Sequence, residues 1–206
     1  MIQQQHSCSR KYASLVLARL FKTGLLEKIE RNRYTAMHDI ALIACNIHTP
    51  SYISGIFLSN YYGFSEQLPI VITVMTPIYY SSVEFQGYTI EFHKTSNMIG
   101  FSKQITPHGA LFLATPEKLL IDCVMMPEIV GNPDEIIKIV KEGNCSSEVL
   151  TQLLTQINDQ SLWKRVGYLL ETYKHISLPH KVFDSNYVDL HPWGVKKPIT
   201  KWRVRV

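Results

Sequence analysis

Residues 7–36 read SCSRKYASLVLARLFKTGLLEKIERNRYTA, and this stretch decides the fold that we expect for the N-terminal part of the chain. From Ser9 onward its apolar residues recur at helical spacing, while most of its cations fall elsewhere around the helix. The hydroxyl of Ser7 or Ser9 can cap the start of this helix, and Gly24 can close its end. The pattern predicts a helix of about four turns with a basic, polar outer face.

A short hairpin is expected directly after this helix. Residues 24–29 predict a strand, residues 30–33 a turn in which Asn32 tolerates a positive φ, and residues 34–36 the returning strand. A helix, a glycine and a short hairpin follow one another in winged-helix DNA-binding units, where a cationic hairpin tip suits contact with phosphates. We therefore interpret the stretch as the recognition helix and wing of such a unit.

The stretch before the expected recognition helix is too short for the two helices that usually precede it in a winged-helix unit. Two helices normally precede the recognition helix, and only about eight residues precede it here. Either the start is truncated, or another element or subunit covers the exposed apolar face. The sequence thus predicts a partial winged-helix DNA-binding unit over residues 1–38.

Positive charge is concentrated at both ends of the chain. Residues 1–36 hold seven cations and two carboxylates, a net +5, and residues 196–206 hold five cations and no acid, another +5. Because the whole chain carries a formal +4, the residues between must carry −6. A clustered positive charge favours a polyanion partner, since each neutralised phosphate releases counterions. Charge alone leaves a solvated basic face without a partner as the alternative.

Six residues of the N-terminal unit are the expected DNA contacts. Three lie early in the helix, where they would meet the groove, and three lie on the hairpin, where they would position the wing on phosphates. They are Arg10, Lys11 and Ser14 on the helix and Lys28, Arg31 and Arg33 on the hairpin.

Residues 39–206 are expected to form a mixed α/β domain. Residues 50–60 predict a helix, residues 69–76 a buried strand, and residues 88–93 a half-buried strand. Residues 98–114 predict a further hairpin, which gives a sheet of four or five strands. Helix start signals of the Thr-Pro-Glu and Asn-Pro-Asp type then predict four helices between residues 116 and 175.

The last residues complete this expectation of an α+β fold. Residues 200–206 alternate cationic and apolar side chains, which suits an edge strand with a charged outer face. At 46% hydrophobic residues the chain can bury a sizeable core, and no apolar run is long enough to span a membrane. We expect a cytoplasmic protein without a signal peptide.

The sequence offers no catalytic constellation. Its four cysteines are far apart and are expected to be reduced, and its histidines lack metal-ligand spacing, so no metal site, cofactor or enzymatic activity is predicted. Glu91, His93 and Lys94 invite a nuclease interpretation, but on a strand Lys94 points away from Glu91.

Two further positions carry charges to which we assign structural roles. Glu117 is expected to stabilise the start of its helix, with Lys118 facing the solvent. Glu171 is expected to form an ordinary surface pair with Lys174, three residues later on the same helix.

Several motifs, in this order, resemble the AbiEi-type antitoxins, which are transcriptional regulators of type IV abortive-infection toxin–antitoxin systems. The likeness extends over nearly the whole chain. Its motifs are Leu17-x-x-Leu20-x-x-x-Gly24-Leu25-Leu26 with the basic wing ending at Tyr34, Pro50-Ser51-Tyr52-Ile53-Ser54 with Tyr61-Tyr62-Gly63, residues 114–122 (ATPEKLLID), residues 163–171 (WKRVGYLLE), and Lys201-Trp202-Arg203-Val204.

The resemblance implies a function in phage defence. Members of this family act as autorepressors that bind operator DNA through the winged helix, while the larger domain antagonises a cognate nucleotidyltransferase-like toxin. Applied to this chain, it implies an inverted-repeat operator and an antitoxin domain over residues 39–206. The alternative is a protein-interaction module with a vestigial winged helix that no longer binds DNA, in which the α/β domain only engages a partner toxin. A nuclease or nucleotidyltransferase is a third hypothesis, which rests on fold analogy.

Overall fold

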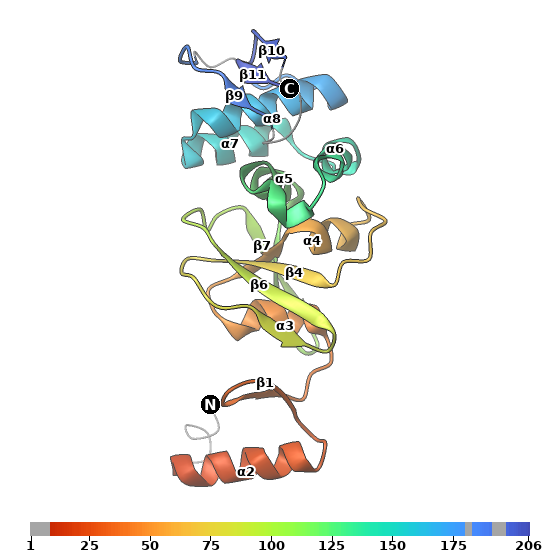
Figure 1. Cartoon of the computed structure of the whole chain (residues 1–206), viewed down its shortest axis with the longest axis vertical. Helices are drawn as coiled ribbons and strands as arrows, with labels where there is room; N and C mark the ends of the chain where they lie inside the picture. The colour runs from red at the N-terminus through yellow and green to blue at the C-terminus, as the bar shows by residue number, and fades with distance from the viewer. Residues whose placement is uncertain (1–8, 180–182, 191–196) are drawn as a thin grey trace.

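Six strands form one mixed sheet at the centre of the molecule, in the order β5-β6-β4-β3-β8-β7 (Figure 1). The computed structural model describes residues 9–179, 183–190 and 197–206. Its central strands are β3 (Tyr52–Ser54), β4 (Val71–Thr76), β5 (Val83–Phe85), β6 (Tyr88–Lys94), β7 (Phe101–Thr106) and β8 (Gly109–Ala114). The β3–β8 and β4–β6 pairs are parallel and the other three pairs are antiparallel, so the sheet is mixed.

Helices cover both faces of this sheet. Helix α3 (Ile40–Ile47) lies on one face, and α4 (Gly55–Tyr61) and α5 (Pro116–Met125) lie on the other (Figure 1). Because both faces are covered, all of β3 and all but the first residue of β4 are buried, and Ile72 and Val74 of β4 are fully buried. This confirms the buried strand that was predicted from the continuous apolar run.

The remaining helices extend the molecule beyond α5. They are the short 3₁₀ helix η1 (Pro127–Val130) and the helices α6 (Pro133–Glu142), α7 (Ser147–Ile157) and α8 (Gln160–Lys174). Thr115 and Asn132 cap α5 and α6 as predicted, each accepting a backbone N–H with its side-chain oxygen. The prediction of four helices between residues 116 and 175 is confirmed.

The prediction for residues 50–60 is wrong at its start. Tyr52–Ser54 is a strand between β4 and β8, and the helix begins only at Gly55. Gly55 has a φ of 70°, and a Cβ at this position would lie 2.8 Å from Thr73 Oγ1, so glycine permits the sharp turn from strand to helix. The sheet has six strands, more than the four or five that the sequence predicted, because the sequence analysis identified neither β3 nor the three-residue β5.

The prediction of an edge strand at the C-terminus is also wrong. Strand β11 (Val204–Arg205) lies in the middle of a small sheet, between β10 (Pro198–Ile199) and β9 (Val188–Asp189). The indole of Trp202, just before β11, lies so close to Gly167 of α8 that any side chain there would overlap it. Trp202 and Val204 are buried, and β11 pairs with β10 on one side and β9 on the other, so it is not an edge strand.

At the opposite end of the molecule, the chain begins with helix α2 (Arg10–Lys22) and the hairpin of β1 (Glu27–Glu30) and β2 (Arg33–Thr35). The hairpin lies between α2 and the central sheet (Figure 1). The architecture as a whole is α+β, as expected. No helix in the described ranges is long and apolar enough to cross a membrane.

Candidate nucleic-acid interface

The start and end of α2 are fixed by local hydrogen bonds. Ser9 caps the helix by accepting the Tyr12 N–H with its hydroxyl at 3.3 Å, whereas Ser7 lies outside the described residues. At the other end, Gly24 adopts a φ of 74°, and the Leu25 N–H donates to the Leu20 carbonyl. This left-handed turn redirects the chain into the hairpin, as the sequence predicted.

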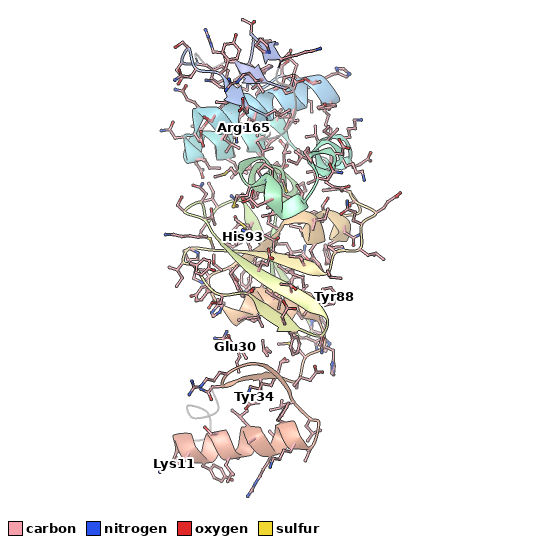
Figure 2. The ribbon with its side chains drawn as sticks, viewed as in Figure 1. Lys11, Glu30, Tyr34, Tyr88, His93 and Arg165 are labelled. Carbon is pink, nitrogen blue, oxygen red and sulfur yellow. The ribbon has the colours of Figure 1, made fainter. Side chains whose placement is uncertain are left out.

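The hairpin packs against the apolar side of α2. Asn32 in its turn has a φ of 64°, as expected. Lys28 and Tyr34 are cross-strand partners, so their side chains share one face of the hairpin. That face meets the helix, because the ring centroids of Tyr34 and Phe21 are 6.0 Å apart. In Figure 2, Tyr34 lies between the hairpin and α2, and Glu30 lies toward the sheet.

The hairpin is also attached to the central sheet through polar contacts. Gln86, in the turn between β5 and β6, donates its side-chain N–H to Glu27 Oε2 at 2.8 Å. His38 Nδ1 lies 3.4 Å from the other oxygen of the same carboxylate. These contacts orient α2 so that one side of the helix faces away from the body of the molecule.

The six predicted contact residues do not all reach the same surface. Lys11, Lys28 and Arg31 are exposed. Arg33 forms an ion pair with Glu30 at 2.9 Å, so part of its charge is neutralised within the hairpin. Ser14 is exposed but lines a cleft beside the helix. Arg10 is the first residue of α2, and its side chain lies outside the described residues.

Two cations on α2 were missed in the sequence analysis. Arg19 and Lys22 are exposed, and they lie eight and eleven residues after Lys11, which places them on the same side of the helix. The helical spacing of these residues was the signal that could have identified them. Within the part of the chain that the structure describes, neither cation forms an ion pair with a carboxylate.

The basic C-terminal segment differs from this surface, because two of its cations have acidic partners. Lys201 pairs with Glu171, which also accepts the Trp202 indole N–H. Arg205 lies 2.7 Å from Asp189. The predicted Glu171–Lys174 surface pair is therefore wrong, because Lys174 instead donates to a backbone carbonyl. The two basic ends of the sequence thus differ: most cations of α2 and the hairpin have no carboxylate partner among the described residues, whereas Lys201 and Arg205 near the C-terminus are paired.

A cleft of about 940 Å³ separates α2 and the hairpin from the body. Apolar side chains from α2, from both strands of the hairpin and from α3 form much of its wall, with polar groups around them. Its lining includes Ala13, Leu17, Ile29, Tyr34, Met37, Leu42, Ile43 and Ile47, together with Ser14, Asn32, Arg33, Asn46, Thr49 and His108. The apolar face for which the sequence predicts a covering element thus borders this cleft.

Two buried residues of opposite charge, Lys118 and Asp122, form a closed network with neighbouring hydroxyl groups inside the body. Lys118 is fully buried rather than facing the solvent, and its Nζ lies 2.7 Å from Asp122 Oδ1. Ser54 donates its hydroxyl to the other oxygen of Asp122 at 2.9 Å, and the Tyr52 hydroxyl lies 3.5 Å from Oδ1. Burial raises the pKa of Asp122, while Lys118 and the hydroxyls oppose that rise.

This network joins two of the sequence motifs, residues 50–54 and residues 114–122, and its charged groups have no access to solvent. The motifs at residues 163–171 and 201–204 also meet, through Trp202, Gly167 and Glu171. The contacts give these motifs a structural role. Glu117 is also structural, because its carboxylate accepts the Ser146 N–H at 2.9 Å, close to the start of α7.

No chemistry of the nuclease type is assembled on β6. Glu91 and His93 are 3.3 Å apart on one face, and the exposed Lys94 comes next on the strand, where side chains alternate between faces. Across residues 9–179, 183–190 and 197–206, no group of three or more acidic, cysteine or histidine side chains could hold a metal ion. Cys45, Cys123 and Cys145 are buried free thiols.

Comparison with known proteins supports the fold. No protein-family model matches the chain, and no curated protein matches it. The crystal structure of the RV2827C protein from Mycobacterium tuberculosis is similar, with a TM-score of 0.63 at 16% sequence identity. The match covers 98% of this chain and 82% of that one. The similarity thus extends over the helix, the hairpin and the α+β body.

Proposed function

We propose that this protein binds double-stranded DNA through α2 and the hairpin, and that it acts as a transcriptional autorepressor. One observation carries the proposal. Five exposed cations gather at one end of the molecule and have no carboxylate partner among the described residues. They are Lys11, Arg19 and Lys22 on α2 and Lys28 and Arg31 on the hairpin. Unpaired cations suit phosphate contacts because they need not first break an ion pair.

The proposal extends to a toxin–antitoxin system of the abortive-infection type. Its support is the ordered set of motifs that resembles the AbiEi-type antitoxins. In this proposal the α+β body engages a cognate nucleotidyltransferase-like toxin in the cytoplasm, and the chain itself has no enzymatic activity. Two contacts in the body support this part of the proposal: the Lys118–Asp122 network and the contact of Trp202 with Glu171. Both use the charged residues of the motifs to hold the body together, as a scaffold for binding requires.

A gel-shift experiment tests the DNA-binding part. The probe is the DNA upstream of the protein's own gene, in which we expect an inverted repeat. Lys11→Ala combined with Arg31→Ala should weaken binding at least tenfold, since each removed phosphate contact lowers affinity. The matched control is Lys201→Ala combined with Arg205→Ala, which also removes two cations and should leave binding unchanged. Equal losses in both variants would count against the proposed surface.

The cleft supports a second candidate, a protein-interaction module that uses this end of the molecule without binding DNA. Its apolar wall and its volume of about 940 Å³ could receive a side chain cluster of a partner. Co-expression with the product of the neighbouring gene distinguishes the two. A protein that co-purifies with that product but shows no salt-dependent DNA affinity favours the second candidate.

A further inference from the structure

The side of α2 that faces away from the body carries a narrow stripe of four residues, two lysines with two apolar residues between them. Lys11, Leu15, Ala18 and Lys22 are spaced by four, three and four residues, so they lie within about 60° of one another around the helix. The opposite side, centred on Leu20, holds the more apolar residues of the helix. The stripe therefore has a cation at each end and two apolar side chains between them.

Three of the four side chains in this stripe are exposed, and the fourth is half-buried. Leu15 is 47% exposed and Lys11 and Lys22 are exposed as well, whereas Ala18 is half-buried. Leu15 thus lies between two exposed lysines on the outward side of the helix, where a DNA groove can reach its apolar side chain. Arg19 lies on one flank of the stripe.

From these positions we propose that α2 lies lengthwise in the major groove and that Leu15 and Ala18 contact thymine methyl groups at the centre of the site. The inference rests on the proposed DNA-binding function and specifies what the helix reads. Lys11 and Lys22 would then lie near the phosphates at either end of the contact. The charge of α2 favours DNA as the partner, because the helix carries cations and no acidic residue and is therefore complementary to phosphate groups.

The length of the stripe sets the size of the site. Eleven residues at a rise of about 1.5 Å span roughly 16 Å, which corresponds to about five base pairs at 3.4 Å each. The major groove is about 12 Å wide and admits a helix in this orientation. Thymine displays its C5 methyl group in that groove, where apolar side chains recognise it. The geometry thus points to an A·T-containing segment of about five base pairs.

Uracil provides the direct test, because it lacks the thymine methyl group but keeps the same hydrogen-bonding groups. The probes are two 24-base-pair duplexes, one of alternating dA·dT and one of alternating dA·dU, titrated at low salt by fluorescence anisotropy. The wild-type protein should prefer the thymine duplex by roughly fourfold for each methyl group contacted. Leu15→Ala should remove most of this preference.

Leu25→Ala is the matched control, because Leu25 is also an exposed leucine, at 65%, and lies beyond the helix. This variant should keep the wild-type preference. Equal binding of the two duplexes by the wild type, or an unchanged preference in Leu15→Ala, overturns the inference and leaves DNA binding itself intact. Failure to bind either duplex at low salt overturns the proposed function as well.

Discussion

Removal of the Lys118 ammonium by Lys118→Met should strongly destabilise the protein. Lys118 is fully buried, and its partner Asp122 is only 1% exposed. Without the lysine, the carboxylate keeps the Ser54 hydroxyl at 2.9 Å and the Tyr52 hydroxyl at 3.5 Å but loses its countercharge. Breaking a buried ion pair from one side typically costs about 3–5 kcal/mol, and we expect the free energy of unfolding to fall by that amount at pH 7.

The loss should depend on pH in a defined direction. Burial already raises the pKa of Asp122, and removal of Lys118 takes away the main group that opposes this rise. A carboxyl group with a higher pKa in the folded than in the unfolded state binds more protons when folded. The stability of the variant should therefore fall as the pH rises above the unfolded value of about 4.

Urea denaturation followed by circular dichroism at pH 5, 7 and 8 measures both effects. A double variant, Lys118→Met with Asp122→Leu, removes both charges and should recover at least about 1 kcal/mol relative to Lys118→Met alone. A loss below about 1 kcal/mol in Lys118→Met, or a loss that does not change with pH, would refute the argument that an uncompensated buried carboxylate causes the effect.

Three further changes test the packing described above by the same denaturation assay or by hydrogen exchange. Gly55→Ala should cost more than about 2 kcal/mol, because its φ is positive and the new Cβ would meet Thr73 Oγ1; a neutral effect would contradict the tight turn. Trp202→Ala should cost about 3–5 kcal/mol by emptying the space over Gly167, and an intact C-terminal sheet in the variant would argue against that packing. Ser9→Ala should cost about 1 kcal/mol and speed exchange in the first turn of α2, whereas unchanged exchange there would exclude the cap.

The parts of the fold that the sequence predicted are those set by local rules. The caps at Ser9, Thr115 and Asn132 depend only on a side chain and the next few N–H groups. The turn at residue 32 likewise needs only a residue that tolerates a positive φ. Strand β3 was missed because three residues buried on both faces show no alternation, and its pairing with β4 and β8 is not local.

The charged residues also divide into those with a local sequence signal and those whose partners are distant in the sequence. Lys118 and Asp122 are spaced by four residues on one helix, a local signal that could have identified their ion pair, but lysine is usually exposed and was assigned to the surface. The buried Lys164 pairs with Asp184 at 2.5 Å across a long stretch of chain, and no local pattern predicts that contact. The same limit applies to the C-terminal cations, whose partners lie on other elements.

The salt dependence of DNA affinity tests the central claim most directly. The wild-type affinity for the upstream DNA should fall with salt at a logarithmic slope of roughly −4 to −5 if all five unpaired cations contact phosphates. The triple variant Lys11→Ala, Lys22→Ala and Arg31→Ala should lower that slope by about 3 in magnitude. The variant Lys201→Ala, Arg203→Ala and Arg205→Ala should keep the wild-type slope. A wild-type slope near zero, or a reduced slope in the C-terminal variant alone, would contradict an interface formed by α2 and the hairpin.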